Sequence, residues 1–252
     1  MLTDDKYSDS KDSADDQGEH SSAVYLSDLF SEIDEGANFL NRLSKEEVAK
    51  IRKAGIPRKF REKDQVFFQG EEHKGIWLIE QGSVRTFYVG PTGREITLAL
   101  WTSGHFVGGP EIFGGGEHVW SGEIQEDAEL LFLSSGGLRK LIEEVPNFAV
   151  CIINGLVAKG KCYSALVQML ATRSVNERLA QLLIIFADTH GRQDGDTLLI
   201  DKKITHDQLA NIVGSTRQWV TTTLDKFQKQ GVISVSRQQI AIEDLDALNC
   251  ML

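Results

Sequence analysis

Cysteine is scarce in this chain of 252 residues. Cys151, Cys162 and Cys250 are scattered, and none of them belongs to a CxxC pair. This excludes a disulfide framework, a CxxC-type zinc site and an iron–sulfur cluster, which needs four neighbouring thiolates. A reducing, cytoplasmic location suits so few thiols. Cys151 and Cys162 could pair across a dimer only if both lay on its seam, so we interpret them as structural thiols.

Metal-site, enzyme and membrane signals are also missing. His73, His105 and His118 lack the short HxH spacing of a cupin-type metal enzyme, so we expect no metal site and no enzyme. His118 is the candidate axial ligand for a haem, but we expect a loop histidine to be solvated, and no cofactor is predicted. No apolar run approaches the roughly 18–20 residues that a membrane span requires.

Positive charge is in deficit, because 27 Lys and Arg residues face 37 Asp and Glu residues, giving a net charge of −10. Residues 1–20 hold seven acids and two lysines, and this serine-rich start is neither a signal nor a transit peptide. We expect residues 1–23 to be a disordered, solubilising tail, with a functional role as the alternative. Residues 201–240 carry six basic and three acidic residues, so DNA could lie there.

Residues 204–230 have the pattern of two short helices separated by Gly214. Thr205 with Gln208 and Ser215 with Gln218 are capping-box pairs, and Gly214 allows the positive φ of a helix end. Arg pairs with guanine, Gln with adenine, and Thr with a thymine methyl or a phosphate. The pattern predicts a helix-turn-helix DNA reader whose candidate contacts are Ser215, Thr216, Arg217, Gln218, Thr221, Thr222 and Lys226.

An ordinary helical hairpin with a solvated face is one alternative interpretation of this stretch. Another is a ligand-binding module whose helix-turn-helix serves only as a protein interface. Residues 231–242 favour the DNA reader, because they form two β-rich runs that look like the wing of a winged helix. Long donors also stand at the amino end of the second helix, where residues that read a groove must lie.

The rest of the chain changes character twice before the helix pair. A helix capped by Ser44 and Glu47 ends at Pro57, and residues 58–133 alternate short β-rich runs with glycine turns, including a hairpin turn at 90–93. Helical patterning returns from 138, and a longer helix follows from about 147. Its apolar stripe is wider than packing on a barrel requires, so we prefer a dimer coiled coil to simple packing.

We therefore predict an α+β fold with an acidic tail (1–23), a β jelly-roll sensor domain (24–146), a dimerisation helix (147–171) and a winged helix-turn-helix domain (172–252). This order, with the motifs at 70–85, 91–98, 104–113, 175–183 and 204–233, resembles the Crp/Fnr family of bacterial transcription regulators. The resemblance covers about residues 40–243. It implies a homodimeric, cytoplasmic regulator of a palindromic double-stranded operator, with RNA polymerase as a candidate partner and no membrane.

The resemblance also assigns roles at matching positions of the reader. Arg217 matches the arginine that reads guanine. Gln218 stands where the family often has a glutamate that accepts from cytosine, and Thr222 replaces a second frequent arginine. The implied operator is therefore related to the best-known palindrome of the family but differs from it.

The effector site departs more from the family. Cyclic-nucleotide-binding members carry a glutamate for the ribose and an Arg-Ser pair for the phosphate, where this chain has Gly109, Val119 and Trp120. We expect an allosteric effector that is small, aromatic and not a cyclic nucleotide. Its candidate contacts are Gly108, Gly109, Glu111, Val119, Trp120, Tyr163 and Val167. The alternatives are that Trp120 and Tyr163 simply fill the space, and that the protein is haem-responsive, redox-responsive or constitutively active.

Overall fold

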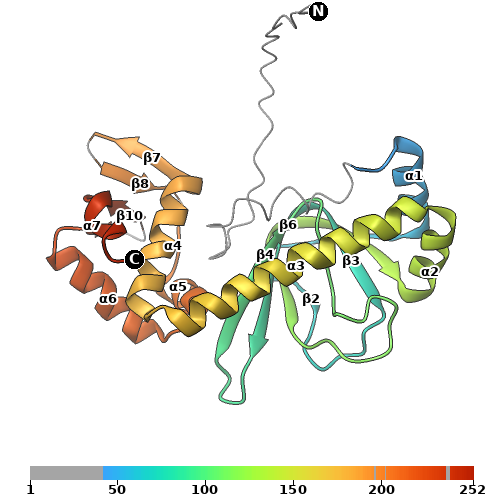
Figure 1. Cartoon of the computed structure of the whole chain (residues 1–252), viewed down its shortest axis with the longest axis horizontal. Helices are drawn as coiled ribbons and strands as arrows, with labels where there is room; N and C mark the ends of the chain where they lie inside the picture. Colours follow the sequence, from blue (N-terminus) through green and yellow to red (C-terminus); the bar gives the residue numbers. More distant parts are fainter. Residues whose placement is uncertain (1–41, 196, 202, 237–238) are drawn as a thin grey trace, which may run out of the picture.

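The computed structural model describes residues 42–252, apart from 196, 202 and 237–238. The acidic tail expected over 1–23 lies outside the described residues, as does any structure before residue 42. The described chain forms a β-rich domain, a long helix and a mixed C-terminal domain (Figure 1). The predicted fold class, a jelly roll followed by a long helix and a winged helix-turn-helix, is confirmed.

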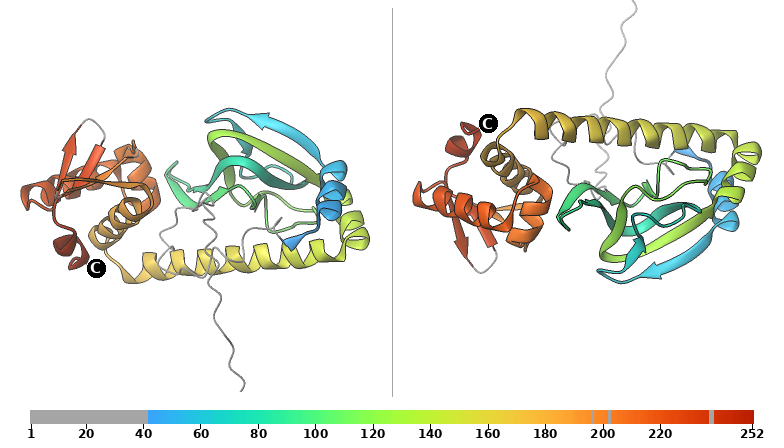
Figure 2. Two further views of the ribbon diagram at one scale, coloured as in Figure 1. Left: turned by 90° about the horizontal axis from the view of Figure 1, so that it is seen from above. Right: turned by 90° about the horizontal axis from the view of Figure 1, so that it is seen from below.

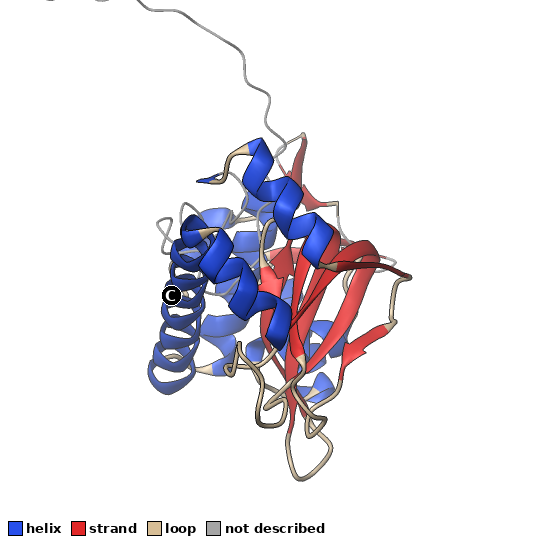
Figure 3. Cartoon of the chain, turned by 90° about the vertical axis from the view of Figure 1, so that its right-hand side faces the viewer, coloured by secondary structure: helices blue, strands red, loops and turns tan. Residues whose placement is uncertain are grey.

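The first domain is an antiparallel jelly roll closed by two helices at one end. Its sheet has the order β1-β6-β3-β4, while β2 pairs with β6 and β5 pairs with β3. The helices stack beside each other at the end of the sheet (Figure 3). In chain order the elements are α1 (Lys45–Ala54), β1 (Ile56–Phe60), β2 (Gln65–Phe67), β3 (Gly75–Val89), β4 (Glu95–Thr102), β5 (Phe106–Val107), β6 (Ser121–Ser134) and α2 (Ser135–Glu144).

Local chemistry fixes the first helix and the hairpin as expected. The Ser44 hydroxyl accepts from Glu47 N and the Glu47 carboxylate accepts from Ser44 N, so the capping box starts α1. The hairpin turn at 90–93 joins β3 to β4, with Gly90 N donating to Arg94 O at 2.8 Å. Both predictions are confirmed.

The strands differ from the expectation in length. β3 is one strand of 15 residues rather than two short ones, because the chain passes Gly82 with a positive φ and a shifted register instead of turning. β6 likewise begins at Ser121, well before the apolar run of its second half. β1 was not predicted as a strand, because it contains Pro57, which marks the end of the preceding helix.

The long helix α3 (Pro146–Thr172) contributes to all three hydrophobic clusters of the described chain. Phe148 packs under α1 and α2, Cys162 packs inside the jelly roll, and Leu166 packs in the C-terminal domain. Both views in Figure 2 place the two domains on the same side of α3. One helix thus anchors both domains through different parts of its length.

α3 is also apolar and long enough to span a membrane, with a mean hydropathy of 1.3 in its most apolar window. Of that window, 39% is buried inside the protein. Several apolar side chains face outward instead: Val150, Ile153, Leu156, Val157 and Val167. The predicted single stripe is therefore wrong in detail, because Tyr163 and Leu166 pack against the core while these residues remain exposed.

The C-terminal domain contains α4 (Val175–His190), β7 (Gly191–Asp194), β8 (Thr197–Ile200), α5 (His206–Val213), α6 (Arg217–Lys229), β9 (Ile233–Ser236), β10 (Gln239–Ile242) and α7 (Leu245–Asn249). Its sheet has the order β7-β8-β10-β9, so the predicted wing strands are present as β9 and β10. α5 and α6 bury Leu209, Val213, Val220, Leu224 and Phe227 in the core beneath them. Burying a side chain of this size contributes roughly 1.5–3 kcal/mol.

The turn between α5 and α6 depends on Gly214, whose φ of 64° is left-handed. The Thr205–Gln208 capping box starts α5, as predicted. The prediction that Ser215 caps α6 is wrong. Thr216 is the capping residue and accepts from Trp219 N, because Ser215 N is used to donate to Ala210 O and close the preceding helix.

We predict that Gly214→Ala lowers the free energy of unfolding by about 1–2 kcal/mol, because a Cβ disfavours the left-handed conformation. The added methyl would also lie 3.2 Å from Leu170 Cδ2. Urea unfolding measures the loss. Gly136→Ala in α2 is the matched control, because its Cβ would meet nothing within 4 Å. A Gly214→Ala protein as stable as this control would contradict the role of the turn.

Candidate nucleic-acid interface and effector site

The first turn of α6 presents its long polar side chains to solvent. Arg217 and Gln218 are exposed side by side just after the Thr216 cap. Arg217 Nη1 lies 3.6 Å from Asp207 Oδ2 of α5, and both side chains are largely exposed. Such a pair contributes little to stability, so the guanidinium can exchange this partner for another at little cost. Lys226 is exposed two turns further along α6.

Three of the hydroxyl groups near this turn are already engaged within the protein. Thr221 Oγ1 donates to Arg217 O at 3.0 Å and lies 2.8 Å from His206 Nδ1 of α5. Thr222 Oγ1 donates to Gln218 O. Ser215 is half-buried in the turn, and Thr216 caps the helix. Of the seven predicted DNA contacts, the two threonines of the second turn therefore offer their methyl groups more readily than their hydroxyls.

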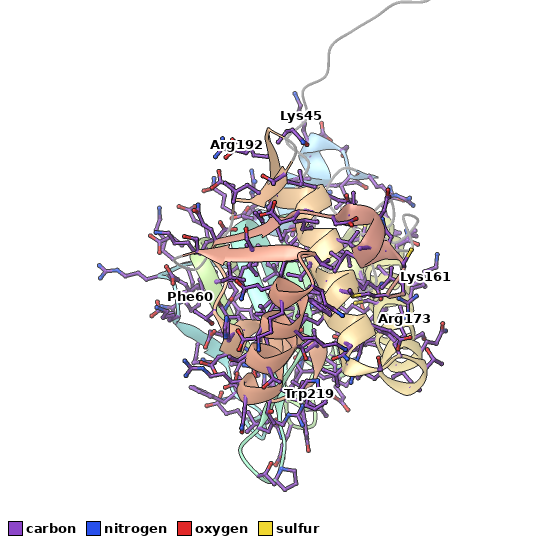
Figure 4. All side chains as sticks on the ribbon, turned by 90° about the vertical axis from the view of Figure 1, so that its left-hand side faces the viewer. Lys45, Phe60, Lys161, Arg173, Arg192 and Trp219 are labelled. Carbon is purple, nitrogen blue, oxygen red and sulfur yellow. The ribbon has the colours of Figure 1, made fainter. Side chains whose placement is uncertain are left out.

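Trp219 is a surface residue of this helix that the sequence analysis missed. Its indole is 48% exposed, and it lies at the outer edge of the C-terminal domain (Figure 4). It is the third residue of α6, next to Gln218. An aromatic residue in an amphipathic helix is easily taken for a core residue. Here Val220 faces the core, and Trp219 beside it remains exposed. A large exposed ring among groove-reading side chains adds an apolar contact to the same surface.

The reader helices also touch the jelly roll. Leu98 of β4 packs against the core of the C-terminal domain, and Asn211 Nδ2 of α5 lies 3.5 Å from Glu95 Oε2 of β4. The same Glu95 carboxylate accepts from Arg85 Nη2 at 2.8 Å. Arg85, only 14% exposed in its side chain, also meets Glu123 at 3.4 Å. A line of charged and polar groups thus runs from the sheet to α5.

The structure brings together some of the predicted effector residues and separates others. Trp120 and Tyr163 meet with ring centroids 5.7 Å apart, and Trp120 Nε1 donates to Gly108 O at 3.1 Å. Gly109 is buried against His73, where a Cβ would lie 2.5 Å from the ring. Gly108 and Gly109 therefore serve close packing. Glu111 and Val119 are exposed in the loop.

Val167 does not join the other predicted effector residues, because its side chain is 64% exposed on the outer face of α3. It lies about one turn after Tyr163, but it remains in solvent where Tyr163 is covered by Trp101 and Trp120. Including Val167 among the effector contacts assumed one broad apolar face, whereas α3 has a buried apolar face and an exposed one.

Lys159 and Trp101 are residues of this region that the sequence analysis missed. The Lys159 ammonium lies 3.4 Å from the centroid of the Trp101 ring and 4.8 Å from that of Phe106. Burial lowers the pKa of Lys159 to about 7, although the nearby Cys162 thiol acts in the opposite direction. Burial likewise raises the pKa of the Tyr163 hydroxyl well above its usual range. The spacing of Lys159 from Tyr163, one helical turn, was the available signal.

The three histidines of the jelly roll are buried, so the expectation that the loop histidine His118 is solvated is wrong. His73 and His118 lie with ring centroids 4.6 Å apart, and His118 stacks on Phe67. Burial and the neighbouring His73 lower the pKa of His118 to about 4. Burial and Lys159 lower the pKa of His105 to about 4. Within the described residues, no group of three or more His, Cys, Asp or Glu side chains could hold a metal ion.

Comparison with known proteins places both domains. A family described as cyclic nucleotide-binding domain matches residues 57–145, and one described as Crp-like helix-turn-helix domain matches residues 177–251. The chain is 25% identical over 186 residues to a global nitrogen regulator of Synechocystis, covering 73% of this chain and 83% of the relative. It is 24% identical over 201 residues to a cAMP-activated regulator of Mycobacterium tuberculosis, covering 80% and 90%.

The fold agrees with these matches. The solved structure of the c-di-GMP responsive global regulator of Xanthomonas campestris superposes with a TM-score of 0.73 at 18% identity, covering 79% of this chain and 99% of that one. The chain is therefore built as a DNA-binding regulator, and the proteins it resembles are regulators rather than enzymes. It belongs to the Crp/Fnr family of transcription regulators.

We predict that the protein loses stability as pH falls from about 6.5 to about 4. In that window an unfolded His105 takes up a proton that the folded chain excludes, so the unfolded state binds more protons. His105 alone contributes on the order of 2–3 kcal/mol across the window. Urea midpoints at pH 7.0 and 5.5 measure the slope. His105→Gln should make the slope shallower and leave the part that His118 contributes, and an unchanged slope in this variant would contradict the assignment.

Proposed function

We propose that this regulator is a cytoplasmic homodimer that reads a palindromic operator and responds to a small effector. The observation that carries the proposal is the start of α6, where Arg217 and Gln218 stand exposed on a capped, rigid helix. Arginine pairs with guanine and glutamine with adenine through two hydrogen bonds each. Ser215, Thr216, Thr221, Thr222 and Lys226 complete the proposed contact surface, and Trp219 adds an apolar edge to it.

The exposed apolar side of α3 supports the dimer. Val150, Ile153 and Val157 follow one another at helical spacing and are each more than half exposed. Burying this face against a second copy recovers free energy that a monomer forgoes. Two-fold symmetry would also place two α6 helices on the two half-sites of a palindrome. RNA polymerase is a further candidate partner of the DNA-bound dimer.

The effector site is proposed at the aromatic cluster between the jelly roll and α3. Trp120 and Tyr163 form one side of it. Trp101 meets Tyr163 edge to face, with their ring centroids 6.4 Å apart. Gly109, Val119 and Trp120 supply no positive charge for a cyclic phosphate. An effector bound here would shift the balance between two arrangements of the reader helices.

We predict that Arg217→Ala lowers the affinity for the operator by about 10- to 100-fold, the loss expected for one bidentate base contact. A labelled pool of palindromic DNA first identifies the operator sequence that the protein prefers. Fluorescence anisotropy on that labelled operator then measures the affinity at two salt concentrations. Arg192→Ala is the control, because Arg192 is exposed on β7, away from α6 (Figure 1). If Arg217→Ala binds the operator as tightly as this control, α6 is not the reader.

We predict that Ile153→Glu converts the dimer to monomers, because the side chain is 58% exposed in one chain and would be buried against the second. A buried unpaired carboxylate is strongly unfavourable. Sedimentation velocity gives the assembly state. Ile56→Glu, at a position 53% exposed on β1, is the matched control and should leave the dimer intact. A dimeric Ile153→Glu protein would place the interface elsewhere.

A further inference from the structure

The aromatic cluster contains two polar head groups without a polar partner in the described chain. The Lys159 ammonium rests on Trp101 and Phe106, and none of the ion pairs or hydrogen bonds among the described residues includes it. The Tyr163 hydroxyl is fully buried and accepts and donates no hydrogen bond there. Buried polar groups are nearly always paired, so each of these needs an explanation.

The surroundings of these two groups are already engaged. Thr86 lies close enough to lower the pKa of the Tyr163 hydroxyl slightly, against the effect of burial, but the two hydroxyls do not meet in ordinary hydrogen-bond geometry; the Thr86 hydroxyl donates to Ala99 O and accepts from Trp101 Nε1. Arg85, the neighbouring cation on β3, is neutralised by Glu95 and Glu123. The cluster therefore holds one amine without a counter-ion, whose pKa burial lowers to about 7, and one hydroxyl without a hydrogen bond.

The two groups are placed to act together. Lys159 and Tyr163 are four residues apart on α3, so their side chains leave the same face of the helix one turn apart. Both reach the sheet beside Trp101, and Trp120 faces the Tyr163 ring. An ammonium and a hydroxyl bordered by flat apolar rings match a ligand with an anionic head and a planar body.

We propose that the effector is a small monovalent organic anion, such as an aromatic carboxylate, whose charged head pairs with Lys159 and accepts from the Tyr163 hydroxyl. This inference rests on the proposed effector site and adds the chemical class of its ligand. The cation–π contacts hold the ammonium in place without a counter-ion. An incoming carboxylate supplies that counter-ion and forms a charge-assisted hydrogen bond in a poorly solvated site.

The first test compares benzoate and phenylacetate with benzamide and phenylacetamide, and with cyclic AMP, in thermal unfolding of the full-length protein. The carboxylates should raise Tm by about 5 °C at a hundred times their Kd, and the uncharged amides should not. Equal shifts with acid and amide, or no shift with either carboxylate, would overturn the proposal. A rise in Tm with cyclic AMP alone would mean that Lys159 pairs with a nucleotide phosphate, and would also overturn the proposal.

Variants locate the site. Lys159→Met should abolish the shift, and Tyr163→Phe should weaken binding of the carboxylate several-fold. Lys161→Met, which removes an exposed charge from the same helix (Figure 4), should leave the shift unchanged. A shift that persists in Lys159→Met would place the anion elsewhere on the protein and refute the assignment.

The ligand-free proteins provide an independent readout. Lys159→Met should have a higher Tm than the wild type, because it removes an enclosed charge while keeping a chain of similar length. A lower Tm would mean that the lysine serves the fold through its ring contacts, and the proposal would fail. Lys159→Gln provides a second variant with a neutral polar end.

Operator binding separates this inference from the proposed function. If the protein binds a palindromic site and no carboxylate stabilises it, the regulator stands and the ligand class is wrong. If carboxylates act through Lys159 but no specific DNA is bound under any condition, the ligand class stands and the reader assignment fails.

Discussion

The packing of one helix, α3, sets the arrangement of everything else in this protein. Its amino-terminal part closes the jelly roll, its middle part covers the interior of the sheet, and its last turns enter the core of the reader domain. Because protein interiors are close-packed, a helix shared by three clusters cannot move at one of them without disturbing the others. α3 also leaves an apolar side unburied, so the same element that joins the domains offers a surface to a second chain.

Much of the fold could be predicted because the signals were local. The capping boxes at Ser44 and Thr205 and the left-handed Gly214 each depend on a few neighbouring residues, and they lie where the sequence placed them. Strand lengths could not be predicted in the same way. Gly82 looks like a turn in the sequence, yet β3 continues through it because pairing with β6 and β4 outweighs a local preference.

The candidate site divides along the same line. Exposed groups on α6 follow from helical periodicity, so Arg217 and Gln218 lie where the sequence put them. Groups that depend on long-range packing were misplaced or missed. His73 and His118 are buried because a loop after β2 meets a loop before β6, and Lys159 acquires its unusual environment only when α3 lies across Trp101. Lys159, which the sequence alone would place in solvent, thus becomes a buried amine through its contact with Trp101.

The same contacts limit how a change at the aromatic cluster can reach α6. One route is α3 itself, since Leu166 lies in the reader core and Leu170 approaches Gly214 at the turn. The other is the sheet, since Thr86, which holds Trp101, adjoins Arg85, and Arg85 meets Glu95 beside Asn211. The two routes end on α5 and on its turn into α6. A shift of α3 relative to the sheet would therefore act on the helix pair through both contacts at once.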